Sequence, residues 1–129
     1  MRLLLDTNAY SAMRSDNREI FALFRRADDV LLSTIVLGEI LYGIEHGGRR
    51  DENMTVLNRF LAQPRVRLVP VTRTTADRYA RVASSLRRKG RPIPTNDIWI
   101  AAHALETGSD LVSFDEHFAD VDGLVWLRP

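Results

Sequence analysis

Short apolar runs alternate along this chain with longer segments whose apolar residues recur every three or four positions. The short runs are typical of buried strands, and the periodic segments are typical of helices with one buried face. The predicted strands span residues 3–5, 30–33, 66–71, 111–113 and 124–127. The predicted helices span residues 19–27, 34–45, 53–61, 74–89 and 95–107. This alternation predicts an α/β fold in three layers, with a mostly parallel sheet of about five strands between helices.

The ends of the predicted helices carry recognisable signals. Thr34 and Thr95 precede apolar helical segments and are predicted to be N-caps, while Gly108 is predicted to end a helix. The chain shows no internal repeat, low-complexity segment or linker, so its 129 residues predict a single domain, 1–129. A chain of this length buries enough surface for a hydrophobic core without disulfides.

Four carboxylates interrupt apolar sequence at the ends of these elements. Asp6 ends the first predicted strand, Asp115 follows the fourth, Glu39 breaks an apolar helix, and Asp97 lies in the first turn of the last predicted helix. In parallel α/β sheets, sites form outside the carboxyl ends of the strands, so these acids are predicted to converge there. Two charges 4 Å apart repel by about 4 kcal/mol at an effective dielectric constant near 20. Converging acids therefore predict a divalent cation.

Each acid also has a purely structural interpretation. Asp6 is a suitable helix cap, Asp97 complements a helix dipole, and Asp115 fits an Asx turn. Glu39 is harder to explain, because it lies too far from Thr34 for a capping box. A glutamate at the edge of the apolar stripe, reaching toward solvent, remains the alternative for that position.

Composition excludes some classes of site. The chain has no cysteine, which excludes disulfides, thiolate zinc sites and a cysteine nucleophile. This fits a reducing compartment, and we expect a cytoplasmic protein. The amino-terminal apolar run is too short for a signal peptide, and Glu39 breaks the longest apolar stretch, so no membrane span is expected. The net charge of +1 says little about partners.

Four segments that contain the acids resemble the motifs of PIN-domain nucleases. They are LLDTN at 4–8, STIVLGEILYG at 33–43, IPTNDIWIAA at 93–102 and LVSFDEHF at 111–118. In combination they are similar to the VapC toxins of bacterial toxin–antitoxin systems, and the resemblance spans residues 3–127 in the right order. Ser113 and Phe114 depart from the common pattern, in which Thr and a polar residue are frequent.

The resemblance implies a PIN-like sandwich and metal-dependent hydrolysis of RNA phosphodiester bonds. It implies that Asp6, Glu39, Asp97 and Asp115 are the catalytic acids and bind Mg²⁺ or Mn²⁺. It also implies a homodimer and an inhibitory VapB-like antitoxin. Magnesium prefers oxygen ligands and is usually held by one or two carboxylates together with substrate phosphate, which agrees with this set of acids.

Other polar residues are assigned supporting or structural roles. Hydrogen bonds to the acids are expected from residues beside them, namely Thr7, Asn8 and Ser113. A basic segment precedes Asp97 and is either a phosphate guide for RNA or an ordinary charged helix end; it consists of Arg87, Arg88, Lys89 and Arg91. The histidines lack the spacing of a zinc site and are interpreted as structural or surface residues; they are His46, His103 and His117.

Two other functional classes compete with a nuclease. One is a catalytically silent PIN-fold module that binds its antitoxin and acts in DNA-bound autoregulation, although the presence of all four acids argues against loss of catalysis. The other is an aspartyl-phosphate protein. A dehalogenase-type phosphatase needs a second Asp two residues after the first, but position 8 is Asn. A receiver domain needs a lysine at a strand end, but Lys89 lies at the end of a predicted helix.

Overall fold

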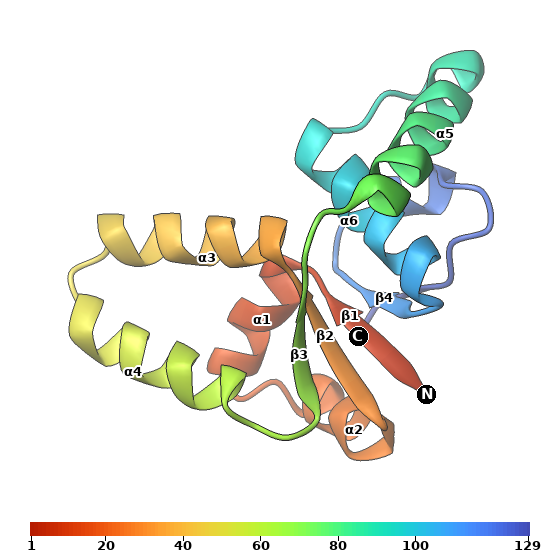
Figure 1. Ribbon diagram of the computed structural model, residues 1–129. Helices are drawn as coiled ribbons and strands as arrows, with labels where there is room; N and C mark the ends of the chain where they lie inside the picture. Colours follow the sequence, from red (N-terminus) through yellow and green to blue (C-terminus); the bar gives the residue numbers. More distant parts are fainter.

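The computed structural model describes residues 1–129 and contains five strands and six α-helices. In chain order the elements are β1 (Arg2–Leu5), α1 (Thr7–Arg14), α2 (Arg18–Arg26), β2 (Asp29–Ser33), α3 (Thr34–His46), α4 (Arg50–Leu61), β3 (Val66–Val69), α5 (Arg73–Lys89), α6 (Thr95–Thr107), β4 (Asp110–Val112), a short 3₁₀ helix η1 (Glu116–Asp120) and β5 (Trp126–Leu127). Figure 1 shows α3 and α4 as a pair that extends to one side of the sheet, and α5 and α6 on the other side.

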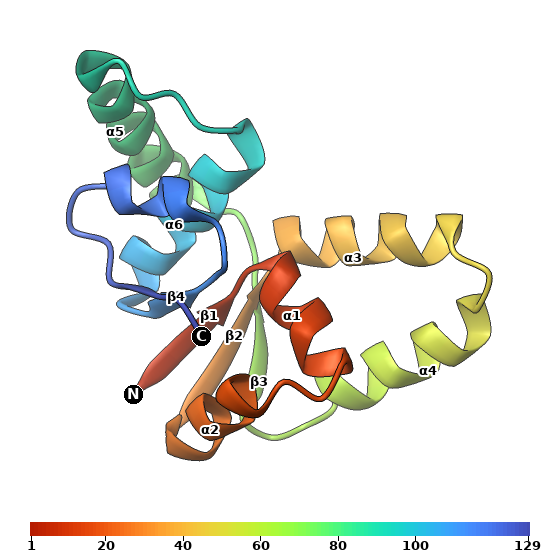
Figure 2. The same ribbon diagram turned by 180° about the vertical axis from the view of Figure 1, so that it is seen from behind.

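All strand pairs are parallel, and their order is β3-β2-β1-β4-β5. The chain builds the sheet outward from β1 to β2 and β3, and it then returns to the other side of β1 to add β4. Because parallel crossovers are right-handed, this reversal puts the helices before β4 on the opposite face from those before β3. In Figure 2, which views the molecule from behind, α1 and α2 lie in front of the sheet. A three-layer sandwich results, and the order reverses between β1 and β4.

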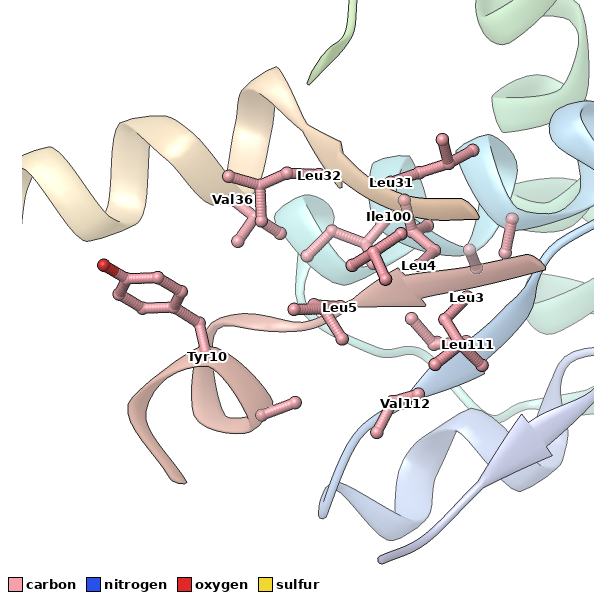
Figure 3. Close-up of a cluster of buried hydrophobic side chains, with 14 of the residues drawn as sticks. Leu3, Leu4, Leu5, Tyr10, Leu31, Leu32, Val36, Ile100, Leu111 and Val112 are labelled. Atoms are coloured by element: carbon pink, nitrogen blue, oxygen red, sulfur yellow. The ribbon is translucent and has the colours of Figure 1, made fainter. Parts of the chain in front are cut away.

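The core forms on both faces of the central strand. Leu3, Leu4 and Leu5 are 0% exposed, which explains why β1 is apolar at every position rather than at alternate ones. Figure 3 shows Leu4 pointing toward Ile100 of α6 and Leu5 pointing to the other side of the strand. Burying the side chains of such residues stabilises the fold by about 1.5–3 kcal/mol each. The sheet is thus fixed between two apolar layers.

The helices differ from the sequence-based expectations in several places, and α4 begins at Arg50 rather than at residue 53. Helix α1 was not predicted, because only Ala9 and Tyr10 are buried and the segment has no long apolar stripe. Ser33, not Thr34, caps α3, and its hydroxyl accepts a hydrogen bond from the Ile35 N–H at 3.0 Å. Helix α6 begins without a side-chain cap, so Thr95 is not the cap that was predicted.

His103 connects three elements inside the molecule. Its side chain is 0% exposed, its Nδ1 lies 2.8 Å from Ser33 Oγ, and its Nε2 lies 3.2 Å from the Pro70 carbonyl oxygen. A neutral ring with its proton on Nε2 satisfies both contacts, and burial lowers the pKa of His103. The structural interpretation of this histidine is confirmed. No helix of the structure combines the length and the apolar character that crossing a bilayer requires.

We expect the central strand to dominate the stability of the fold. Replacing Leu4 by Ala removes a fully buried side chain from β1 and should lower the free energy of unfolding by about 2–5 kcal/mol. Leu68 on the edge strand β3 is 42% exposed, and Leu68→Ala should cost under about 1 kcal/mol. Equilibrium unfolding in urea measures both losses. Equal losses in the two variants would contradict this account of the core.

Candidate active site

The four acids singled out in the sequence line one hollow of about 720 Å³. Asp6 follows β1, Asp115 follows β4, Glu39 lies on α3 and Asp97 lies in the first turn of α6. The remaining lining residues are Thr7, Asn8, Ser11, Pro94, Thr95 and Asn96, so no hydrophobic residue borders the hollow. It opens where the strand order reverses between β1 and β4, which is where α/β sheets bind their ligands.

Asp6 is the most buried of these acids, with 3% of its surface exposed. The pKa of Asp6 is raised to about 6, chiefly by burial and also by the nearby charges of Asp97 and Asp115. Hydrogen bonds from the Ser113 hydroxyl and the Thr7 backbone N–H oppose this rise but do not cancel it. The ionised carboxylate therefore lacks part of the stabilisation that water would give it.

Two hydroxyl groups hold Asp6 and its neighbours in place. Ser113 donates its hydroxyl to Asp6 Oδ2 at 2.7 Å and accepts the Asp115 backbone N–H at 3.0 Å. Thr7 donates its backbone N–H to Asp6 Oδ1 at 2.8 Å and its hydroxyl to Glu39 Oε1 at 2.9 Å. These are the hydrogen bonds expected of Thr7 and Ser113. They link three of the four acids, from β1, α3 and the end of β4, into one network.

Asp6 also forms the start of α1. Its side chain accepts the Thr7 N–H, and its backbone is extended as an N-cap requires. The structural interpretation of Asp6 as a helix cap is thus correct, and it does not exclude a role at the site. One carboxylate oxygen holds the start of the helix, and the other faces Ser113.

Asp97 faces the hollow from the amino end of α6, with 13% of its side chain exposed. Burial raises the pKa of Asp97, His117 lowers it, and Asp115 raises it. His117 Nε2 lies 2.8 Å from Asp97 Oδ2. Sequence reasoning missed this contact, because it tested the histidines for zinc spacing and interpreted His117 as a structural or surface residue. Its place two residues after Asp115 was the signal available.

Asn8 lines the hollow but bonds to no acid. Its side-chain oxygen accepts the Phe114 backbone N–H at 3.2 Å, which connects α1 to the segment after β4. The backbone at Phe114, a departure from the common motif, is therefore held in place. Asn8 acts on the segment that carries Asp115 rather than on a carboxylate.

The basic segment lies outside the lining of the hollow. Lys89 donates to the Asp120 carbonyl and to Asp122, and Arg91 lies 4.0 Å from Asp120. Arg88 donates to the Ser84 hydroxyl on its own helix. Two of the four basic residues, Lys89 and Arg91, therefore have acidic partners within the chain, and these contacts explain their charge without a role in RNA binding.

Comparison with known proteins agrees with the fold and the motifs. The PIN domain family model matches residues 3–124. Ribonuclease VapC2 of Haemophilus influenzae is 30% identical over 88% of this chain and 86% of its own length. The structure of VapBC-1 from nontypeable Haemophilus influenzae has a TM-score of 0.86 at 25% identity, covering 99% of this chain and 98% of that chain.

A second solved structure supports the fold alone, because its identity is lower. It is VapBC2 from Rickettsia felis bound to a DNA fragment from its promoter, with a TM-score of 0.89 at 24% identity. It covers 100% of this chain and 99% of that chain. The family match extends over nearly the whole chain, and one relative is 30% identical over 88% of this chain and 86% of its own length. The chain therefore belongs to the PIN-domain family, among the VapC ribonucleases.

Proposed function

We propose that this protein is a metal-dependent endoribonuclease toxin that hydrolyses RNA phosphodiester bonds and is neutralised by a VapB-like antitoxin. One observation carries the proposal: acids from four separate segments meet around one polar hollow, and the most buried of them, Asp6, has a pKa raised to about 6. Carboxylates gathered in this way repel one another, and the burial of Asp6 disfavours its charged form further. A bound cation offsets both the burial and the repulsion.

The residues present fit a divalent cation. The hollow offers carboxylate oxygens from Asp6, Glu39, Asp97 and Asp115, which suit Mg²⁺ or Mn²⁺. The buried Nε2 of His117 has no hydrogen-bond partner and lies beside Asp97. When bound, such a cation stabilises charge on a phosphodiester and lowers the pKa of a coordinated water.

The chain's own residues would position the reacting groups. Ser113 and Thr7 fix the carboxylates of Asp6 and Glu39 by hydrogen bonds, so the acids need little rearrangement before substrate binds. The basic segment ends at Arg91, four residues before Thr95, and Thr95 lines the hollow. We also propose that the positive charge of this segment guides the RNA backbone toward the acids. Its basic residues are Arg87, Arg88, Lys89 and Arg91.

We also propose that this protein binds two kinds of protein partner. One is a second copy of this chain in a homodimer. The other is a small antitoxin, as in the VapBC complexes whose fold this chain shares. A toxin that only binds its antitoxin and regulates transcription would need none of the four acids, so tests of catalysis separate the two functions.

Loss of a metal-binding acid should abolish RNA cleavage. Asp97→Asn keeps the size of the side chain but removes its charge, and we expect cleavage of total RNA to fall at least about 100-fold, because even indirect support of a metal site is worth 10- to 100-fold. EDTA should have the same effect on the unaltered protein. Asp77→Asn on α5, which is 58% exposed, is the control and should retain full activity. Undiminished cleavage by Asp97→Asn or in excess EDTA would contradict the proposal.

Asp6 should make the metal-free protein less stable as the pH rises. Its pKa is 3.8 in the unfolded reference and about 6 in the fold, so the folded protein holds this proton more tightly. The stability associated with that proton is fully present below about pH 4 and is lost as the pH rises through about 6. A difference of about two pKa units corresponds to about 3 kcal/mol.

Asp6→Asn should remove this pH dependence. The quantity to compare is the free energy of unfolding of Asp6→Asn minus that of the unaltered protein, both in EDTA. Between pH 4 and a pH above 6, this difference should rise by up to about 3 kcal/mol in favour of the variant. Urea unfolding at pH 4, 5, 6 and 7 measures the change, with Asp77→Asn as the matched control. The hydrogen bonds that favour the ionised carboxylate are already included in its pKa of about 6. A stability difference that does not vary with pH would show that Asp6 titrates normally.

The antitoxin should act at the acids themselves. An arginine pairs with a carboxylate through two hydrogen bonds and stays charged, so we expect an extended carboxyl-terminal segment of the partner to place an Arg beside Asp6, Glu39, Asp97 and Asp115. Expression of the toxin alone should stop growth, and co-expression with its VapB-like antitoxin should restore it. Replacing that Arg by Ala should weaken the rescue. A toxin that is harmless alone would refute the toxin role and leave the nuclease activity to be judged by the cleavage assay.

A further inference from the structure

His117 lies beside the acidic hollow, against Asp97, on a segment to which the four-acid motif assigns no role. It is the second residue of η1, which begins directly after Asp115. Its ring packs against Phe118, with ring centroids 4.9 Å apart, and the Phe118 side chain is itself only 1% exposed. The imidazole is therefore supported from behind, and its Nε2 lies toward Asp97.

The contact between His117 and Asp97 is close but does not have the direction of a hydrogen bond. Nε2 lies 2.8 Å from Asp97 Oδ2, yet this buried nitrogen has no hydrogen-bond partner. Buried polar atoms in folded proteins are nearly always bonded. A protonated ring would form an ion pair with Asp97 at this distance, whereas a neutral ring needs another partner for this nitrogen. A cation bound to both atoms supplies one, because the nitrogen and the carboxylate oxygen then both direct lone pairs at it.

The separations in this cluster agree with shared coordination. One ligand atom each from Asp97, Asp115 and His117 lies within 4.8 Å of the others. In an octahedral complex with bonds of about 2.1 Å, adjacent ligands are about 3 Å apart and opposite ligands about 4.2 Å apart. The 2.8 Å separation of Nε2 and Oδ2 is close to that of adjacent ligands. The 4.8 Å limit on the three separations is a little above the distance between opposite ligands.

We propose that His117 Nε2 is a direct ligand of the divalent cation, together with Asp97 and Asp115; this rests on the metal site of the proposed function. The four acids then do not complete the ligand set, which includes one nitrogen. An imidazole adds affinity for first-row transition ions and little for Mg²⁺, which takes oxygen ligands. The site therefore prefers Mn²⁺ to Mg²⁺.

Electron spin echo spectroscopy of bound Mn²⁺ tests the ligand directly, because a coordinated imidazole nitrogen modulates the echo. The purified full-length protein is stripped with EDTA and loaded with Mn²⁺. We expect nitrogen modulation in the unaltered protein and none in His117→Gln. The matched control is His46→Gln in the last turn of α3, where the ring packs on Tyr42 with centroids 4.2 Å apart. This control should keep the signal.

Calorimetric titration separates a ligand from a residue that only positions Asp97. Loss of a ligand nitrogen should weaken Mn²⁺ binding about tenfold or more and weaken Mg²⁺ binding much less. Loss of a positioning contact should weaken both ions alike, and that result would overturn the proposal. Replacing the natural isotope with ¹⁵N-histidine in the unaltered protein gives the same test without a substitution, should His117→Gln fail to fold. The ring nitrogens of His103 are both engaged elsewhere, so His103 is not the source of a signal.

The outcomes distinguish this inference from the proposed function. Mn²⁺ that binds with no nitrogen modulation would refute the His117 ligand and leave an all-oxygen metal site intact. If the unaltered protein binds neither Mn²⁺ nor Mg²⁺, the metal-dependent function itself fails, and the His117 ligand fails with it. Nitrogen modulation that disappears in His117→Gln and persists in His46→Gln establishes the ligand.

Discussion

The carboxylate of Asp6 is removed from water, and the elements around it are arranged to satisfy it. It ends the central strand, where both faces of the sheet are covered, so its only available partners are groups at the carboxyl edge. The first residue of α1 and the residue after β4 supply them. Hydrogen bonds to a charged group contribute about 1.5–3 kcal/mol each, which does not fully offset burial here. The remaining deficit favours a cation at this edge of the sheet.

Local sequence patterns were sufficient for most of the fold, because most elements bury apolar residues with a clear period. Helix α6, for example, was predicted with its observed bounds. Helix α1 has no such pattern, since it is short and its start depends on Asp6 rather than on an apolar face. Strand β5 is shorter than the apolar run predicted, because only Trp126 and Leu127 pair with β4. The length of a strand depends on which residues of a neighbouring strand pair with it, and that strand can be distant in the sequence.

The convergence of the four acids could be predicted from the sequence to the extent that topology alone determines it. Acids at strand ends and helix starts meet at one edge in any parallel α/β sheet, and the structure brings all four to one hollow. The position of His117 depends instead on η1, whose five residues turn the chain back toward α6. The pairing of Lys89 with Asp122 likewise depends on where the carboxyl-terminal loop lies. Contacts of this kind come from tertiary packing, which periodicity does not encode.

The reversal of strand order between β1 and β4 has a consequence for a chain during synthesis. A ribosome makes Asp6 and Glu39 early, but Ser113 and Asp115 belong to the last fifth of the chain. The hydrogen bond from Ser113 to Asp6 spans 107 positions in the sequence, so the central strand lacks its neighbour on that side until β4 has been made. Such distant pairings form late in folding. A polypeptide that ends before β4 therefore lacks Asp115 and the Ser113 hydroxyl that holds Asp6, so its group of acids is still incomplete while translation proceeds.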